Sequence, residues 1–157
     1  MTHWHRHGDL EAARLLGRVS WGLDYLRRHW GGALRVSATS LWEAFEPAWE
    51  QAPDPHAASM IGPDHARFGG YETSLCHGWS AGPVPWLHRA VLGVEVRGPD
   101  RARVAPRLGD LAFARGTVPT ARGPLAVEAR REGDEVRVEV DAPDGLEVEL
   151  EPVAGGD

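Results

Sequence analysis

The aromatic and imidazole side chains of this chain are confined to its first part. All seven Trp precede residue 87 and all eight His precede residue 89, whereas the chain after residue 96 has no Trp, His, Tyr or Cys. The two parts therefore differ in the structure they can build. We place the boundary near Val96–Asp100, because Arg97-Gly-Pro-Asp100 carries strong turn signals. The resulting domains cover residues 1–96 and 97–157.

The first part has the periodicity of helices. Asp9 is a candidate N-cap and Gly31-Gly32 a candidate stop signal for a single helix. Between them, apolar residues recur every three or four positions, at Leu10, Ala13, Leu16, Val19, Leu23, Leu26 and Trp30. A second helix is predicted over 84–92, with Gly93 at its end. The stretch between the two helices contains too many helix breakers for another long helix, so we predict mostly loop there.

The second part alternates apolar and charged residues. Three runs follow this pattern strictly, at 125–129, 136–140 and 146–150, and a weaker strand is predicted near 112–118. Turn signals that contain glycine separate the strict runs. Each run would bury one face only, so we predict an antiparallel sheet or a small sandwich. Because a piece of about 60 residues has a thin core, we expect it to depend on the helical part for stability.

Charge and composition exclude several classes of protein. The chain has 17 Arg, no Lys and 23 acidic residues, and a net charge of −6 argues against a nucleic-acid-binding surface. No apolar stretch approaches the ~20 residues of a membrane span, and Met1–His7 lacks the apolar core of a secretory signal. The single cysteine, Cys76, excludes an internal disulfide and a multi-cysteine zinc site. We therefore predict a cytoplasmic protein with no cofactor and no nucleic-acid or membrane partner.

Glu43 is the carboxylate with the most chemical context. It follows Trp42 directly and precedes Phe45 by two residues. Desolvation by aromatic neighbours suits a carboxylate to general acid or base chemistry, and the flat rings offer surfaces on which a sugar can stack. The alternative interpretation is an ordinary surface glutamate near a helix start.

His77 lies in a run, Ser74–Pro83, that is dense in Gly, Pro, Ser and Trp. Its glycines allow the backbone to approach a ligand closely, and His77 would hydrogen-bond a substrate hydroxyl or polarise a water. The alternative is a loop histidine bound to a carbonyl. Cys76 is a poor candidate nucleophile, because adjacent side chains rarely face each other and no third partner is visible.

His3, His5 and His7 alternate at the start of the chain. In an extended strand, three such histidines could grip a metal ion from one side. The alternative is a solvated chain end, and we predict no metal site.

Three blocks of sequence contain motifs that can be compared with those of known families, and their order along the chain is part of the comparison. They are His29-Trp-Gly-Gly-Ala33 through Thr39-Ser-Leu-Trp-Glu-Ala-Phe-Glu46, then Ser74–Leu87 with Leu92-Gly-Val94, then Val104–Leu111 with Gly116–Thr120 and Gly123–Val127. The first block is similar to the W-G-G … T-T-x-W-E stretch of bacterial α-L-rhamnosidases, glycoside hydrolase family 78. The second resembles the Ser/His loop that leads into the last helix of that family's barrel, and the third resembles its closing β domain.

The resemblance implies a fold that is α+β by segment, with the terminal helices of an (α/α)6 toroid followed by a small antiparallel β-sandwich. It also implies hydrolysis with inversion, in which one carboxylic acid protonates the leaving oxygen and a second carboxylate activates water. Glu43 matches the water-activating base, and His77 matches a histidine that contacts the sugar. Trp42 and Trp79 would wall the rhamnose subsite. The two carboxyl groups of an inverting pair stand about 6.5–9.5 Å apart, so the acid comes from a different loop.

The chain departs from the family pattern at several points. Ser40 replaces the second Thr of the motif and keeps a hydroxyl, whereas Cys76 stands where many members have Asn. The family's general acid lies far upstream of these blocks. None of Asp9, Glu11 and Asp24 sits in a motif that resembles it.

We therefore predict the C-terminal fragment of an α-L-rhamnosidase-like inverting hydrolase, with little turnover by itself. Its expected partners are a rhamnoside or related glycan and the missing N-terminal part of the enzyme. Helices cut from a toroid keep apolar faces in water, so we expect marginal stability or aggregation. Two alternatives stay open: a non-catalytic carbohydrate-binding module, and a structural piece that folds only against a partner that completes the barrel.

Overall fold

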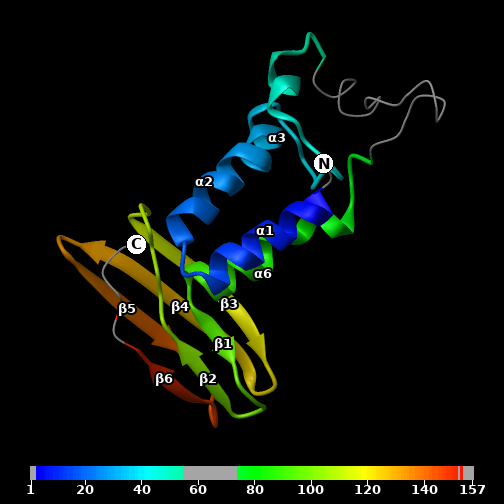
Figure 1. The fold of residues 1–157 in the computed structure, drawn as a ribbon. Helices are drawn as coiled ribbons and strands as arrows, with labels where there is room; N and C mark the ends of the chain where they lie inside the picture. Colours follow the sequence, from blue (N-terminus) through cyan, green and yellow to red (C-terminus); the bar gives the residue numbers. More distant parts are fainter. Residues whose placement is uncertain (1–2, 55–73, 152, 154–157) are drawn as a thin grey trace. The chain divides into compact units, whose positions relative to one another are not determined.

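The computed structural model of the chain describes residues 3–54, 74–151 and 153 (Figure 1). The chain forms two compact units, of which the first comprises Met1–Ala12 and Trp21–Val84 and the second comprises Ala13–Ser20 and Pro85–Asp157. The strands of both sheets lie in the second unit, and most of the helical residues lie in the first. The prediction of a mixed α+β protein is confirmed.

Two helices occupy the region for which one was predicted. Helix α1 covers His3–Leu15 and helix α2 covers Val19–His29, so the prediction of a single helix between Asp9 and Gly31 is wrong. Asp9 lies inside α1 and is not its N-cap. The predicted apolar face is nevertheless buried, except at Leu16, which is 72% exposed between the two helices.

The break between α1 and α2 is a hydrogen-bonded helix end. Gly17 adopts a left-handed φ of +70°, and its backbone N–H donates to the carbonyl of Arg14 at 3.1 Å. The N–H of Arg18 donates to the carbonyl of Ala13 at 2.8 Å. This pair of bonds satisfies the last carbonyls of a helix when a glycine follows it, which explains why α1 stops here.

The glycine pair after α2 begins a helix instead of ending one. Helix α3 covers Gly31–Arg35, with Trp30 immediately before it. Gly32 is required by packing, because a β-carbon at this position would overlap the ring of Phe45. The pair was interpreted as a stop signal, but its second glycine makes room for an aromatic ring.

Short helical turns follow in the first unit. The 3-10 turns η1 and η2 cover Pro47–Gln51 and Gly78–Ala81. The described residues before η1 and η2 are mostly loop, as predicted, whereas the Pro-rich stretch 53–63 lies almost entirely outside the described residues.

The helix predicted over 84–92 is confirmed. Helix α6 covers Pro83–Trp86 and continues into η3, a π-helical turn over Leu87–Val91. The wide turn is closed by the N–H of Leu92, which donates to the carbonyl of Leu87 at 3.0 Å. Gly93 follows with φ +67°, which ends the helix.

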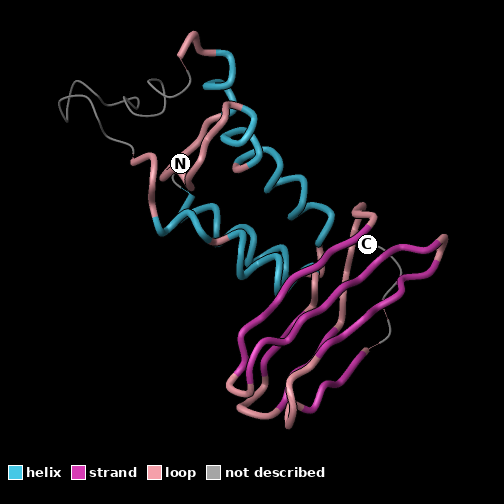
Figure 2. Tube along the Cα trace, turned by 180° about the vertical axis from the view of Figure 1, so that it is seen from behind, coloured by secondary structure: helices cyan, strands magenta, loops and turns pink. Residues whose placement is uncertain are grey.

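The predicted strands of the second part are all present. One antiparallel sheet, in the order β3-β4-β5, is built from Phe113–Thr120, Gly123–Glu132 and Glu135–Asp141. Figure 2 shows these strands running side by side. The alternation places Leu125, Val127 and Ala129 of β4 in the interior, as the sequence predicts.

A second sheet contains two strands that the sequence did not predict. Strand β1 covers Val94–Val96 and pairs antiparallel with β2, Arg101–Val104, so the boundary predicted at Val96–Asp100 falls in the turn of this hairpin. Strand β6, Glu147–Leu150, pairs with β2 in parallel, which corrects the prediction of purely antiparallel pairing. Parallel pairing is possible because the whole β3-β4-β5 sheet intervenes and gives the chain length to return.

The two sheets contribute to one apolar cluster. Its buried members are Leu92, Val94, Ala102, Val104, Leu125, Val127 and Leu146. Partly buried valines of β3, β5 and β6 surround them. Within the described residues, no helix is both long and apolar enough to cross a membrane.

Candidate functional site

Two segments that lie far apart in the sequence are joined in the first unit. The N–H of Glu43 donates to the carbonyl of Ser74 at 2.8 Å, and the N–H of His77 donates to the carbonyl of Leu41 at 2.8 Å. The hydroxyl of Ser40 donates to the carbonyl of Leu75. Three bonds of this kind hold the segments in register, and they bring together two residues that the sequence analysis selected.

Glu43 and His77 face each other across this junction. Oε2 of Glu43 lies 3.8 Å from Nδ1 of His77, and each side chain is 27% exposed. The same carboxylate oxygen accepts a hydrogen bond from the N–H of Ser74 at 3.0 Å. One carboxylate oxygen is thus tethered. The group stays open to solvent, which a base that activates water requires.

Trp79 lies beside this pair and is 67% exposed. It belongs to η2, and its ring meets that of His77 edge to face, at a centroid distance of 5.3 Å and an interplanar angle of 87°. A large exposed indole is a suitable surface for the apolar face of a ring-shaped ligand. The predicted residues Glu43, His77 and Trp79 therefore form one local cluster, which we call the Glu43 cluster.

Trp42, which directly precedes Glu43 in the chain, is buried. Its side chain is only 2% exposed and belongs to the apolar cluster with Ala33 and Phe45. A buried indole has almost no surface to offer a sugar, so its direct effect is to anchor the backbone of Glu43. A place for Trp42 in the wall of a sugar subsite stays a prediction.

A buried hydrogen-bond network fixes the backbone next to Glu43. The carbonyl of Trp42 accepts bonds from the hydroxyl of Ser80 at 2.5 Å and from Nδ1 of His3 at 2.7 Å. Ser80 is held in turn, because Nε1 of Trp30 donates to its carbonyl at 2.9 Å. The N–H of His3 donates to the carbonyl of Glu43 at 2.9 Å. These supporting residues fix the conformation from which the carboxylate projects.

His3 was considered above only as a possible metal ligand. It lies in helix α1, not in an extended strand, and its ring is stacked on Trp30 at 4.3 Å. Its second nitrogen, Nε2, lies 3.2 Å from the carbonyl of His29. Burial lowers the pKa of His3, so the ring is neutral near pH 7 and donates to one carbonyl at a time. The sequence held no signal for this role.

Arg6 supplies a buried positive charge under the same loop. Its guanidinium donates to the carbonyl of Phe45 at 2.6 Å and to Oε1 of Glu46 at 2.8 Å. The Glu46 carboxylate is thus engaged in an ion pair. Of the two glutamates in the segment, Glu43 is the one directed at His77.

His29 makes the first unit sensitive to acid. Burial, reinforced by the charge of Arg6, lowers the pKa of His29 to about 4. In the unfolded chain His29 would take up a proton near pH 6.5, whereas in the folded chain it stays neutral until about pH 4. His29 therefore does not reduce the free energy of unfolding above pH 6.5, and it lowers that free energy progressively as the pH falls toward 4. Urea unfolding followed by Trp fluorescence will show a lower midpoint at about pH 5 than at neutral pH, and His29→Gln will reduce that difference. An equal difference in the variant would contradict this assignment.

The other candidates from the sequence are Cys76 and a metal site. Cys76 is exposed, and its N–H binds the hydroxyl of Ser74 at 3.2 Å. Among the residues that the structure describes, no group of three or more His, Cys, Asp or Glu side chains is arranged to hold a metal ion.

Comparison with known proteins assigns no family to the chain. A scan against protein-family models finds no match, and a search of curated proteins finds no significant match.

Proposed function

We propose that this chain supplies the general base and part of the sugar subsite of an α-L-rhamnosidase-like inverting glycoside hydrolase. The observation that carries the proposal is the Glu43 cluster, in which a tethered and partly exposed carboxylate lies 3.8 Å from His77 beside an exposed indole. The sequence motif around Glu43 supports it independently. The helices would then be the last ones of the toroid, and the two sheets its closing β-sandwich.

In this proposal Glu43 accepts a proton from a water molecule. That water attacks the anomeric carbon from the face opposite the leaving group, while a general acid protonates the departing oxygen. His77 would hydrogen-bond a sugar hydroxyl, and Trp79 would stack on the apolar face of the sugar ring. The acid is proposed to come from outside the described residues, so substrates with poor leaving groups are turned over slowly by this chain.

A non-catalytic carbohydrate-binding module is the second candidate. The exposure of Trp79 favours it as much as it favours catalysis, because a stacking platform needs no base. A third possibility, a helical partner that carries the acid, is supported by exposed apolar side chains on the helices, such as Trp21 and Leu34.

A binding experiment tests the sugar subsite. Trp79→Ala will weaken the binding of L-rhamnose about three- to tenfold, because one aromatic contact is worth roughly 0.5–1.5 kcal/mol. Titration of the full chain with L-rhamnose by NMR measures the effect. Trp21→Ala is the matched control, since Trp21 is also an exposed indole of the first unit but lies on α2. Failure of the wild-type chain to bind L-rhamnose saturably, or equal weakening by both variants, would contradict the subsite.

A further inference from the structure

Strand β5 forms one edge of the β3-β4-β5 sheet, and in the described part of the chain it pairs with β4 alone. Its seven residues, Glu135–Asp141, follow β4 in continuous register without a bulge. Among the described residues, none of the seven makes a backbone hydrogen bond outside this ladder. The N–H and C=O groups on the outer side of β5 therefore form a template to which another strand can be added.

The other sheet edges have features that discourage such pairing. Strands β1 and β6 have only three and four residues, and β3 contains Pro119, which has no N–H to donate. Strand β5 contains neither proline nor glycine, and every second residue in it is a valine. The charged residues between the valines are of both signs, so they select a partner strand instead of repelling every strand.

Like charges stand opposite each other between β4 and β5. The register places Arg130 of β4 opposite Arg137 of β5, and Glu128 opposite Glu139. Such pairs are destabilising in a sheet. The ion pairs of these residues run along each strand instead, from Arg130 to Glu128 and from Arg137 to Glu139, each at 2.8 Å. Arg137 and Glu139 are 63% and 62% exposed, so their pair is weak and leaves both groups accessible to a second partner.

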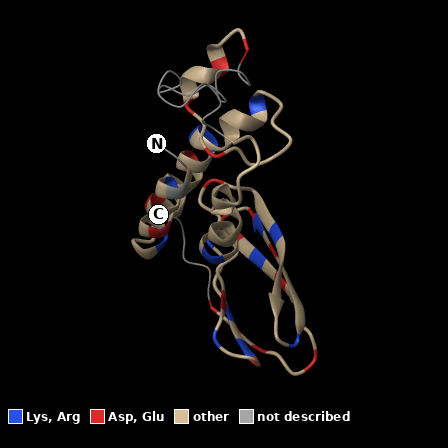
Figure 3. Cartoon of the chain, turned by 90° about the vertical axis from the view of Figure 1, so that its right-hand side faces the viewer, with Lys and Arg blue, Asp and Glu red and all other residues tan. Residues whose placement is uncertain are grey.

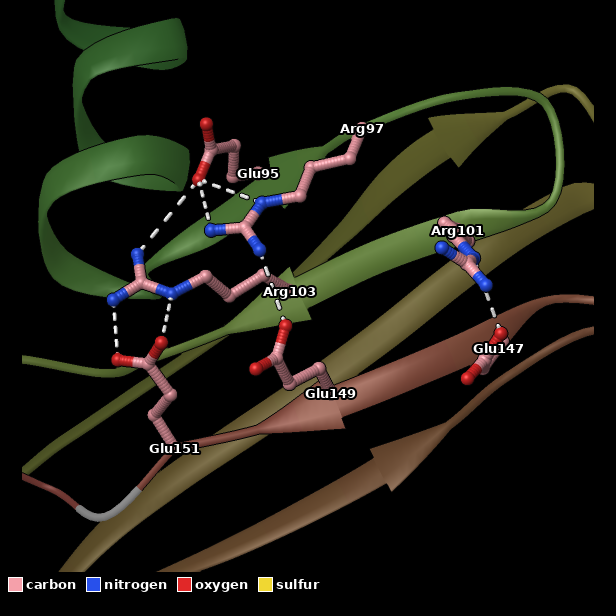
Figure 4. Close-up of polar contacts among 7 residues, drawn as sticks. All are labelled: Glu95, Arg97, Arg101, Arg103, Glu147, Glu149 and Glu151. Carbon is pink, nitrogen blue, oxygen red and sulfur yellow. Dashed lines mark hydrogen bonds and ion pairs between the residues drawn. The ribbon is translucent and has the colours of Figure 1, made fainter.

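The β1-β2-β6 sheet has the opposite arrangement, although basic and acidic residues recur along the strands of both sheets (Figure 3). Arg101 of β2 stands opposite Glu147 of β6, and the two form an ion pair at 3.2 Å. Arg97 reaches Glu149 at 3.1 Å across the same sheet (Figure 4). Charges are thus matched across the strands of this sheet and mismatched between β4 and β5. A strand of the opposite charge pattern beside β5 would correct the mismatch.

We propose that β5 pairs antiparallel with β5 of a second copy of this chain, which joins two three-stranded sheets into one of six strands. In the register centred on Val138, Arg137 faces Glu139 of the second copy, and Glu139 faces Arg137 of the second copy. The valines of the two strands then stand opposite each other on the other face of the sheet. This interface lies apart from the Glu43 cluster in the sequence and does not depend on the proposed hydrolase function.

The charges of β5 select this register among its neighbours. A centre at residue 137 would place Arg137 opposite itself, and a centre at residue 139 would do the same with Glu139. A slip of one residue would bring valines onto the charged face. At the two ends of the chosen register, Glu135 faces Asp141 of the second copy. Both residues are exposed, so salt and solvent screen this repulsion.

Sedimentation equilibrium of the full chain tests the interface. We expect a monomer–dimer equilibrium for the wild type. Arg137→Glu and Glu139→Arg will each weaken self-association about ten- to a hundredfold, because two attractive pairs become repulsive. An equimolar mixture of the two variants will associate within about threefold of the wild-type affinity. In the mixed dimer the introduced glutamate of one variant faces the introduced arginine of the other, so both cross-strand pairs are attractive again.

The two variants are expected to fold, because each change removes a like-charge contact with β4. Arg137→Glu places a carboxylate opposite Arg130, and Glu139→Arg places a guanidinium opposite Glu128. Circular dichroism and the thermal unfolding midpoint check this expectation.

Arg101→Glu is the matched control. It reverses the charge of an exposed arginine that also pairs with a glutamate, but it lies on the central strand of the other sheet. It will leave the dimer affinity within about twofold, since exposed charges away from an interface contribute little. A wild-type chain that stays monomeric at every concentration overturns the proposal. So does equal self-association of the wild type and both β5 variants, equal weakening by the control, or a mixture that associates no better than its components.

Discussion

Glu43→Gln will reduce the hydrolysis of an activated aryl α-L-rhamnoside by about a hundred- to ten-thousand-fold, the usual contribution of a positioned general base. A dinitrophenyl glycoside is the appropriate substrate, because its leaving group departs without protonation. The general acid is then unnecessary, and the activity of this chain reports the base alone. The amide is nearly isosteric with the carboxylate but cannot take a proton from water.

Two additional variants separate the chemistry of Glu43 from its structural effects. Glu50→Gln is the matched control, because Glu50 is a glutamate of the same unit whose carboxylate binds Arg35, at 2.9 Å and 2.6 Å. It should retain the wild-type rate. Azide should restore turnover to Glu43→Ala and form the glycosyl azide with inverted configuration, since an anionic nucleophile needs no base. A structural defect would not be rescued in this way.

The outcomes distinguish the candidate functions. Glu43→Gln activity within tenfold of the wild type would refute the role of Glu43 as the base. A wild-type chain that binds L-rhamnose but does not hydrolyse the activated glycoside would favour the carbohydrate-binding module.

Gly93→Ala will destabilise the second unit by roughly 3 kcal/mol or more, the largest effect that we expect from adding one methyl group. Gly93 has φ +67°, a conformation that costs alanine about 1–2 kcal/mol. In addition, the new β-carbon would overlap the backbone of Ala105, which cannot move like a flexible side chain. Overpacking of this kind typically adds 1–3 kcal/mol.

Gly133→Ala is the control for the backbone strain alone. Gly133 has a similar φ, +64°, but a β-carbon there would meet nothing within 4 Å. Its expected cost is about 1–2 kcal/mol. Urea unfolding of both variants, followed by circular dichroism, gives the comparison. Equal destabilisation would show that the contact with Ala105 is unimportant.

The local sequence pattern was sufficient to predict several of the helices and strands. The alternation in β4 and β5 and the helix over 84–92 follow from periodicities that each segment carries within itself. Strands β1 and β2 were missed although β6, which is no longer than β2, was predicted. They flank the turn signals at Arg97–Asp100, which were interpreted as a domain boundary and not as the turn of a hairpin. Gly17 was a sequence signal for the break between α1 and α2, but the regular apolar spacing on both sides of it favoured one continuous helix.

The candidate site was only partly accessible from the sequence. Glu43, His77 and Trp79 could be selected by residue type and motif, but their proximity depends on hydrogen bonds between segments more than 30 residues apart. The roles of His3 and Ser80 had no local signal, because a buried hydrogen bond is defined by its partner. The burial of the Trp42 side chain could not be predicted either, since an indole in a loop can face either the solvent or the core.

The sequence by itself therefore determined the order and type of the main elements and the residues able to carry chemistry, because these depend on short-range periodicity and side-chain identity. Only the tertiary structure decided the parallel pairing of β2 with β6, the joining of Glu43 to His77, and the register that sets like charges opposite each other between β4 and β5. Each of these depends on which distant segments pack together, and that choice is set by the combined burial and hydrogen bonding of the folded unit, which no local stretch of sequence contains.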